Sequence, residues 1–298
     1  MSRFRTGELF DPEFLESVQR LRIVARRVPR GGRHAEQRSR DLGHGIEFRD
    51  FRAYTPGDDL RAVDWNVYGR LRKVFLRLYE ELEDLPVYLL VDVSASMFHE
   101  TPPRARAGLR TALALAAITL GQHDSVGVFP FSDDLSVLVR PQAGKGRLLS
   151  LAARLASIEP GGPTDLARSL RRFASQRLRT GLVVVVSDFF DPGGVDAVTD
   201  ALKRVRHRLL LVQLARATDR EPALSGDVRL VDCESGASED VSVTREVLAR
   251  YRDAYDRFDG ALATFARTRG AGLLRLDVDR EIIPQLAAVF ERHGEYVT

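Results

Sequence analysis

From about residue 73 onward, apolar runs alternate with stretches whose apolar residues recur at helical spacing. Val87 to Val91 and Leu182 to Val186 are uninterrupted apolar runs, as expected of strands buried on both faces of a sheet, and Leu209 to Leu214 is nearly so. Because helical stretches separate these strands, the pattern predicts an α/β domain with a mostly parallel sheet and helices on both faces. The other predicted elements are helices at 104–122, 147–156, 166–177, 195–205, 244–269 and 281–293 and strands at 74–79, 126–131, 135–139 and 273–276.

Residues 1–72 follow a different pattern from the α/β part. Residues 1–40 combine an amphipathic helical pattern with a basic loop, and residues 41–72 are dense in charged and aromatic side chains. We expect 1–72 to pack on the main domain, 73–298, as an N-terminal extension; a separate lobe is the alternative. Short strands around a Gly- and Ser-rich turn predict a small β-hairpin insertion at about 226–244.

Polar residues stand where the predicted parallel strands end. Asp92 follows the first buried run, Asp188 follows the second, and Thr164 lies in a loop that opens a helix. Ligands of open α/β sheets bind outside the carboxyl ends of the strands, so we expect these three residues to share one edge of the sheet. Ser94 and Ser96 follow Asp92 in the same turn and are expected at that edge too.

These five side chains offer only oxygen ligands. Hard oxygen donors suit Mg²⁺, Mn²⁺ or Ca²⁺ rather than Zn²⁺. Hydroxyls with only two carboxylates leave coordination positions for water or for an incoming carboxylate, which is the incomplete kind of site that Mg²⁺ prefers. The alternative is that the two serines and the threonine merely cap helices. The candidate metal ligands are Asp92, Ser94, Ser96, Thr164 and Asp188.

The pattern Asp92-x-Ser94-x-Ser96, together with Thr164 and Asp188, resembles the metal-ion-dependent adhesion site (MIDAS) of von Willebrand factor A domains. The resemblance implies a three-layer, Rossmann-like α/β fold. It also implies an ion that the hydroxyls bind directly or in alternation with the acids, which often act through water. A carboxylate from a protein partner would complete the coordination shell.

A second motif precedes the α/β part and resembles the signature of the bacterial domain of unknown function 58 (DUF58) family. In that family the signature directly precedes a von Willebrand factor A-like domain, and members commonly accompany MoxR-type AAA+ ATPases. The resemblance therefore implies an adaptor or co-chaperone role beside such an ATPase. The motif reads Gly43-x-Gly45-x-Glu47-Phe48-x-Asp50-x-Arg52-x-Tyr54-x-Pro56-Gly57-Asp58-Asp59-x-Arg61-x-Val63-Asp64-Trp65.

The acids and arginines that alternate in this signature predict a partly buried ion-pair network, which would clamp the segment onto the main domain. Trp65, the single tryptophan of the chain, is expected to be a core anchor. The arginine-rich stretch 20–40 has no interleaved aromatic residues for base stacking, which makes nucleic acid a disfavoured partner and a solvated face the preferred interpretation.

Composition adds an expectation about location. The 298 residues are 44% apolar, carry a net charge of +3 and include a single cysteine, Cys233, so an intrachain disulfide is excluded. The sequence contains neither a signal-peptide pattern at its start nor an apolar run of the length that a membrane span needs. We therefore expect a cytoplasmic protein.

The patterns of common enzymes match poorly. A magnesium-dependent phosphatase of the haloacid-dehalogenase kind also begins with an aspartate at the end of its first strand, but its chemistry wants a second acid where Ser94 stands. The Gly-x-Ser-x-Gly elbow of serine hydrolases and the phosphate-binding loop of ATPases are missing from the sequence. The sequence favours a non-enzymatic, divalent-cation-dependent protein-binding module. A magnesium-dependent phosphatase and a structural protein with a vestigial metal site are the alternatives.

Overall fold

The computed structural model describes residues 4–27, 46–55, 63–71, 73–81 and 85–294. Internal contacts divide the chain into a smaller unit, residues 30–84, and a larger unit, residues 1–29 with 85–298. This grouping differs from the predicted division at residue 72. The N-terminal helices belong to the larger unit, and the predicted strand at 74–79 belongs to the smaller one.

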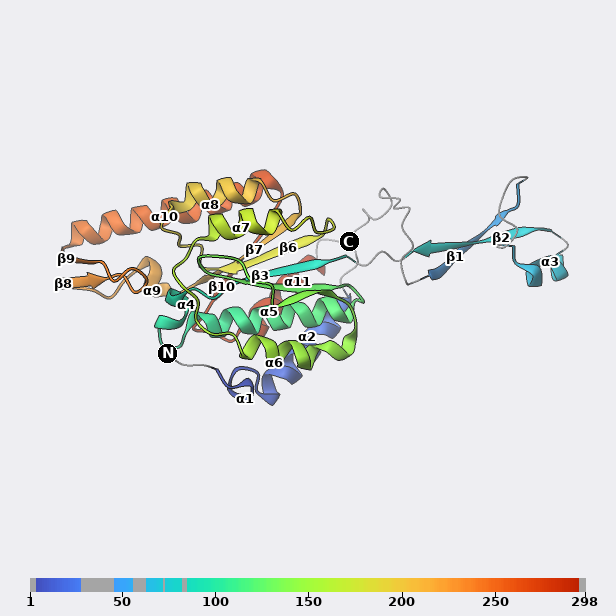
Figure 1. The fold of residues 1–298 in the computed structure, drawn as a ribbon, viewed down its shortest axis with the longest axis horizontal. Coiled ribbons are helices and arrows are strands. Elements are labelled where there is room, and N and C mark those ends of the chain that lie inside the picture. The colour runs from blue at the N-terminus through green and yellow to red at the C-terminus, as the bar shows by residue number, and fades with distance from the viewer. Residues whose placement is uncertain (1–3, 28–45, 56–62, 72, 82–84, 295–298) are drawn as a thin grey trace. The chain divides into compact units, whose positions relative to one another are not determined.

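The larger unit is built on a six-stranded sheet in the order β10-β7-β6-β3-β4-β5 (Figure 1). All neighbouring strands are parallel except β5, which pairs antiparallel with β4 at one edge. The predicted mostly parallel α/β sheet is thereby confirmed. The strands are β3 (Val87–Asp92), β4 (Val126–Phe131), β5 (Val139–Gln142), β6 (Leu182–Ser187), β7 (Arg208–Ala215) and β10 (Gly272–Asp277).

Helices cover both faces of this sheet, because successive residues of its buried strands point to opposite sides. In β3, Leu89 packs into one core and Leu90 into the other, and each such buried side chain contributes about 1.5–3 kcal/mol. One core holds residues of α1 (Thr6–Leu9), α2 (Pro12–Arg27), α4 (Ala95–His99), α5 (Arg104–Gly121), α6 (Leu148–Ala156) and α11 (Ile282–Gly294). The other holds residues of α7 (Leu166–Ala174), α8 (Gly194–Lys203) and α10 (Arg245–Arg269).

The strand predicted at 135–139 lies later in the chain than expected. After β4 the backbone makes a tight turn in which the Asp134 carboxylate accepts a hydrogen bond from the Leu135 amide at 2.8 Å. Leu135 then forms only an isolated bridge to Phe131, and regular pairing resumes with β5 at Val139. Between them the Ser136 and Leu138 amides already donate to the Pro130 and Val128 carbonyls of β4, at 2.9 and 3.0 Å.

The smaller unit contains a two-stranded antiparallel sheet of β1 (Ile46–Ala53) and β2 (Phe75–Glu81). The helix α3 (Trp65–Leu71) lies between the two strands in the sequence. The pairing of β1 with β2 was not predicted. Asp64 begins α3, because its carboxylate accepts a hydrogen bond from the Val67 amide at 3.1 Å. Trp65 is 63% exposed, so the prediction of a core anchor is wrong. Its ring lies at the start of α3 in an edge-to-face arrangement with Tyr68, with the ring centroids 6.1 Å apart.

Parts of the DUF58-like signature and of the arginine-rich stretch lie outside the described residues. These are 43–45 and 56–62 of the signature and 28–40 of the stretch, together with the side chains of the acids and arginines of β1. The predicted ion-pair network therefore also falls outside the described part of the structure.

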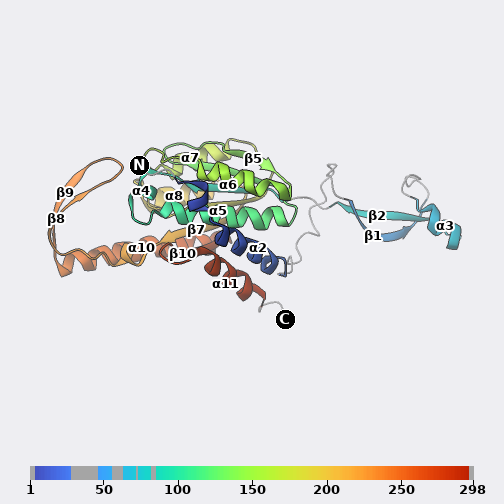
Figure 2. The same cartoon turned by 90° about the horizontal axis from the view of Figure 1, so that it is seen from below.

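A hairpin of β8 (Gly226–Val231) and β9 (Ser238–Val243) stands where the insertion at 226–244 was predicted. It precedes α10, whose first turn is capped by Thr244 through a hydrogen bond from the Val247 amide at 3.2 Å. Figure 2 shows the hairpin leaving the start of α10 and curving back toward α4. A segment more than a hundred residues distant in sequence thus reaches the neighbourhood of the Asp92 turn.

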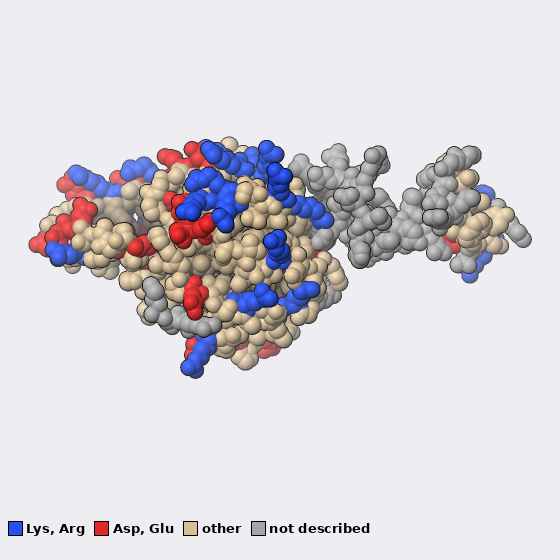
Figure 3. Space-filling model, viewed as in Figure 1, with Lys and Arg blue, Asp and Glu red and all other residues tan. Residues whose placement is uncertain are grey.

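Charge is unevenly spread over the face of the larger unit seen in Figure 3. Lys and Arg side chains gather over α7, and acidic side chains predominate at the end that holds β8 and β9. Arg168 and Arg172 of α7 are half-exposed and lie 3.9 and 3.3 Å from Asp134, so these ion pairs contribute only about 0–1 kcal/mol each. Within the described residues, none of the helices combines the length and apolar character needed to cross a bilayer.

Candidate metal centre

The turn after β3 holds a buried carboxylate and a buried hydroxyl against each other. Asp92 and Ser94 are 1% and 0% exposed. The Ser94 hydroxyl donates to Asp92 Oδ1 at 2.7 Å, and the Ser94 amide donates to the same oxygen at 3.0 Å. Ser94 stands at the N-cap position of α4, but its hydroxyl makes no capping bond there. The capping alternative therefore does not account for this side chain.

The loop before α7 packs directly on the Asp92 turn and positions Thr164. The Gly161 amide donates to the Val93 carbonyl at 2.6 Å, and the Ala95 amide donates to the Gly162 carbonyl at 3.1 Å. A Cβ on Gly161 would collide with the side chain of Ser132, so the close approach requires glycine. The N-cap of α7 is Asp165, whose carboxylate accepts from the Arg168 amide, which leaves Thr164 uninvolved in capping.

The end of β6 supplies the second carboxylate. Ser187 donates its hydroxyl to Asp92 Oδ2 at 2.6 Å and thereby links the ends of β3 and β6. Asp188 follows it, accepts the Phe190 amide at 3.1 Å and lies 3.6 Å from Nη1 of Arg104. Phe189, between Asp188 and Phe190, has a φ of +65°. This backbone conformation costs a non-glycine residue energy and is typical of sites that must hold a particular geometry.

The structure thus brings all five predicted ligands to one edge of the sheet. Ser94 Oγ lies 3.1 Å from Ser96 Oγ, which extends the chain of contacts from Asp92 toward the surface. Thr164 is joined to Ser96 through a shared acidic partner, Glu234. Among the described residues, no three His, Cys, Asp or Glu side chains gather into a metal-binding cluster, so a cation held here depends on the hydroxyls as much as on the acids.

The electrostatics of the site fit a cation. Burial raises the pKa of Asp92 above its ordinary value, against hydrogen bonds from Ser187 and Ser94 that lower it. Burial and the neighbouring charge of Asp92 raise the pKa of Asp188 to about 7, although Arg104 acts in the opposite direction. Two adjacent buried carboxylates are costly to ionise, and a bound divalent cation would favour their charged forms. The donor set and its charge are therefore suited to a hard cation.

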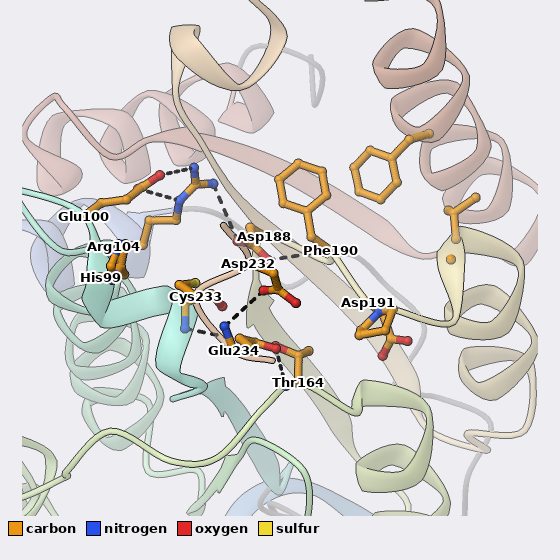
Figure 4. Close-up of a pocket in the computed structure, with 15 residues that line it drawn as sticks. His99, Glu100, Arg104, Thr164, Asp188, Phe190, Asp191, Asp232, Cys233 and Glu234 are labelled. Atoms are coloured by element: carbon orange, nitrogen blue, oxygen red, sulfur yellow. Dashed lines mark hydrogen bonds and ion pairs between the residues drawn. The ribbon is translucent and has the colours of Figure 1, made fainter. Parts of the chain in front are cut away.

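Glu234, at the tip of the β8–β9 hairpin, is a member of this site that sequence reasoning missed. Its carboxylate accepts hydrogen bonds from the Thr164 amide and hydroxyl, both at 2.8 Å, and from the Ser96 amide at 3.4 Å (Figure 4). Burial raises its pKa, but the bonds from Thr164 and Ser96 outweigh that effect and lower the pKa below its ordinary value. Nothing in the local sequence around Glu234 signals this role.

An open cavity of about 470 Å³ lies over the site. Ser96, Thr164, Asp188 and Glu234 line its floor, and Phe190 and Phe258 form an apolar wall with their rings stacked at 4.9 Å. A protein side chain could enter such a space and meet both a charged floor and an aromatic wall.

Arg104 is the counter-charge of this region and was also missed. The residue is 4% exposed, and its guanidinium donates to both oxygens of Glu100 at 2.9 and 3.0 Å and to both oxygens of Asp219. Burial lowers the pKa of Arg104, but these bonds outweigh it and raise the pKa above its ordinary value. Figure 4 shows Arg104 between Glu100 and Asp188, so it connects Glu100, which also lines the cavity, to the end of β6.

If the site holds Mg²⁺, Ser187→Ala is expected to weaken its binding about tenfold without unfolding the protein, because groups that orient a metal ligand typically contribute about 10–100-fold to affinity. The hydroxyl both donates to Asp92 and accepts from the Phe189 amide at 2.9 Å. Calorimetric titration of the chelator-treated protein with Mg²⁺ measures the change. Ser175→Ala, which removes an exposed hydroxyl bonded only to the Arg172 carbonyl, is the control and should bind as the wild type does.

Comparison with known proteins places the chain in a family. Uncharacterized proteins of Mycobacterium tuberculosis and Mycobacterium bovis are each 27% identical to it over 280 residues, 92% of this chain and 88% of theirs. An aerotolerance-related membrane protein from Bacteroides fragilis, of solved structure, aligns at 14% identity with 71% of this chain and 98% of its own, with a TM-score of 0.41. For the conserved hypothetical protein BatB from Bacteroides thetaiotaomicron the values are 14%, 71%, 99% and 0.39. The model of the family described as "Protein of unknown function DUF58" matches residues 50–259, most of the chain, and the protein therefore belongs to the DUF58 family.

Proposed function

We propose that this DUF58 protein is a non-enzymatic binding module that captures an acidic side chain of a protein partner through a divalent cation. The observation that carries the proposal is the convergence of oxygen ligands from three distant segments at one edge of the sheet, with a carboxylate seated against two of them. That carboxylate, Glu234, lies where the incoming acid of a partner would be expected.

The proposed roles follow from the contacts of each side chain. Ser94, Ser96 and Thr164 would hold the ion, with Mg²⁺ the first candidate and Mn²⁺ and Ca²⁺ the others. Asp92 and Asp188 would supply negative charge and orient coordinated water. The cation, when bound, provides a concentrated positive charge that attracts a carboxylate. Arg104, whose Nη1 lies 3.6 Å from Asp188, would hold that carboxylate in place.

The class of partner comes from the family resemblance. DUF58 proteins commonly accompany MoxR-type AAA+ ATPases, and we propose such an ATPase as the partner, in the cytoplasm, with this protein as adaptor or co-chaperone. The open cavity above Thr164 and Asp188 is wide enough to admit a side chain from a protein surface.

Thr164→Ala tests the coordination mechanism. Removal of this hydroxyl is expected to lower the affinity for Mg²⁺ at least about tenfold and to abolish Mg²⁺-dependent retention of the MoxR-type ATPase in a pull-down. Thr218→Ala, which truncates an exposed threonine of α9 (Ala217–Arg220), serves as the matched control. Retention of the ATPase that is unchanged by EDTA and by Thr164→Ala would show that coordination is not the binding mechanism.

The same preparations separate the two alternatives. A magnesium-dependent phosphatase would turn over p-nitrophenyl phosphate and lose this activity in Asp92→Asn, whereas a binding module shows no turnover. A structural protein with a vestigial site would give no heat on titration with Mg²⁺, Mn²⁺ or Ca²⁺. Ser94, which stands where the phosphatase needs an acid, has its hydroxyl committed to Asp92 and is no substitute for that acid.

A further inference from the structure

The β8–β9 hairpin is joined to the rest of the larger unit mainly at its tip. In the described part of the chain, the hydrogen bonds from the hairpin to the sheet domain all belong to Glu234, which contacts Thr164 and Ser96. The strands themselves bury little: Leu230 and Val231 are 44% and 62% exposed. A segment held through the hydrogen bonds of one side chain, with little apolar burial behind it, can detach at small cost.

The tip is built to present Glu234. Asp232 accepts hydrogen bonds from the Glu234 amide at 3.0 Å and from the amide and hydroxyl of Ser235. The turn closes through a bond from the Gly236 amide to the Asp232 carbonyl at 2.8 Å, and Gly236 has a φ of +72°, which favours glycine. Because the backbone is fixed on both sides of Glu234, its side chain is directed into the site rather than left to sample solvent.

The hairpin also resembles an acidic partner in its charge. Five acids and one arginine lie between residues 226 and 243. Arg229 is paired with Asp240 at 2.7 Å across the strands, so it does not neutralise the tip. The tip therefore offers the site the same chemistry that a partner would offer: a carboxylate on an exposed, negatively charged protrusion.

We propose that Glu234 is an intramolecular ligand of the metal centre that occupies the place of the partner's acidic side chain. This inference rests on the proposed function. In this closed state the hairpin covers the site. A partner carboxylate binds only when the hairpin leaves, so Glu234 lowers the apparent affinity for acidic partners and restricts binding to those able to displace it. If the hairpin is closed about nine-tenths of the time, its removal raises apparent partner affinity about tenfold.

Glu234→Ala in the full chain tests this inference, with Mn²⁺ as the probe ion. Removal of a ligating carboxylate opens a position to water, so the water-proton relaxivity of the bound Mn²⁺ is expected to rise. A peptide with one glutamate among neutral residues is then titrated onto the Mn²⁺-loaded proteins. We expect it to bind Glu234→Ala about tenfold more tightly than the wild type. Glu239→Ala, which removes an exposed acid from β9 of the same hairpin, should match the wild type in both measurements.

The outcomes separate the inference from the proposed function. If Mn²⁺ binds both proteins with the same relaxivity, or the peptide binds both with the same affinity, Glu234 is not a competing ligand, while cation binding itself stands. If Mn²⁺ binds neither the wild type nor Glu234→Ala, both the proposed function and this inference are wrong. Glu234 lies on an exposed hairpin outside the two cores, and coincident melting curves verify that the variant is folded.

Discussion

Arg104→Met is expected to destabilise the larger unit by about 3–5 kcal/mol, because removal of one partner from a buried ion pair leaves the buried carboxylate of Asp219 uncompensated. The substitution keeps a side chain of similar length, so it leaves little cavity. It removes the hydrogen bonds to Glu100 and Asp219 and the positive charge beside Asp188. For a unit of this size the loss corresponds to a fall in melting temperature of roughly 6–20 °C.

Urea denaturation followed by far-ultraviolet circular dichroism measures this effect, since most of the described helices belong to the larger unit. Arg172→Met is the control: its pair with Asp134 at 3.3 Å is solvent-exposed, and its loss should cost less than about 1 kcal/mol. Arg104→Lys should fall between the two, because lysine keeps the charge but loses the planar, bidentate contacts. Equal stability of Arg104→Met and the control would show that the network is not a structural element.

On the proposed function, Asp92→Asn is expected to reduce Mg²⁺ affinity by about 100-fold while the fold is kept. It removes one of the two negative charges of the site together with a group that orients coordinated water, and such groups typically contribute about 10–100-fold. The amide has nearly the shape of the carboxylate and can still accept a hydrogen bond from Ser94 or Ser187. In EDTA the variant should be no less stable than the wild type, because a buried neutral amide costs less than a buried carboxylate without a cation.

Melting curves with and without Mg²⁺ check this expectation. An ion that binds only the folded state adds about 2.7 kcal/mol at a concentration of 100 times its dissociation constant, so the wild type should gain stability and Asp92→Asn should not. Asp253→Asn, an equal loss of charge at an exposed position of α10, should respond to Mg²⁺ as the wild type does. The same stabilisation of Asp92→Asn by Mg²⁺ would show that Asp92 takes no part in binding the ion.

The sequence by itself determined the α/β sheet and the meeting of the five predicted ligands. Short apolar runs such as Val87 to Val91 are typical of strands buried on both faces, and parallel strands end at a common edge. Asp92 and Asp188 were therefore expected to approach each other once both strands were recognised. These are local patterns combined with one general rule of topology. Ser94 and Ser96 were expected at the same edge because they belong to the turn that follows Asp92.

The tertiary structure alone decided which other groups complete the site. Glu234 lies 70 residues from Thr164 along the chain and Arg104 lies 115 from Asp219, and neither pairing leaves a local pattern, because each depends on how a segment curves back over the sheet. No local pattern showed that the N-terminal helices belong to the larger unit or that Trp65 is exposed. Periodicity shows that a side chain faces a core or solvent, but only the packed chain shows which distant group it meets there.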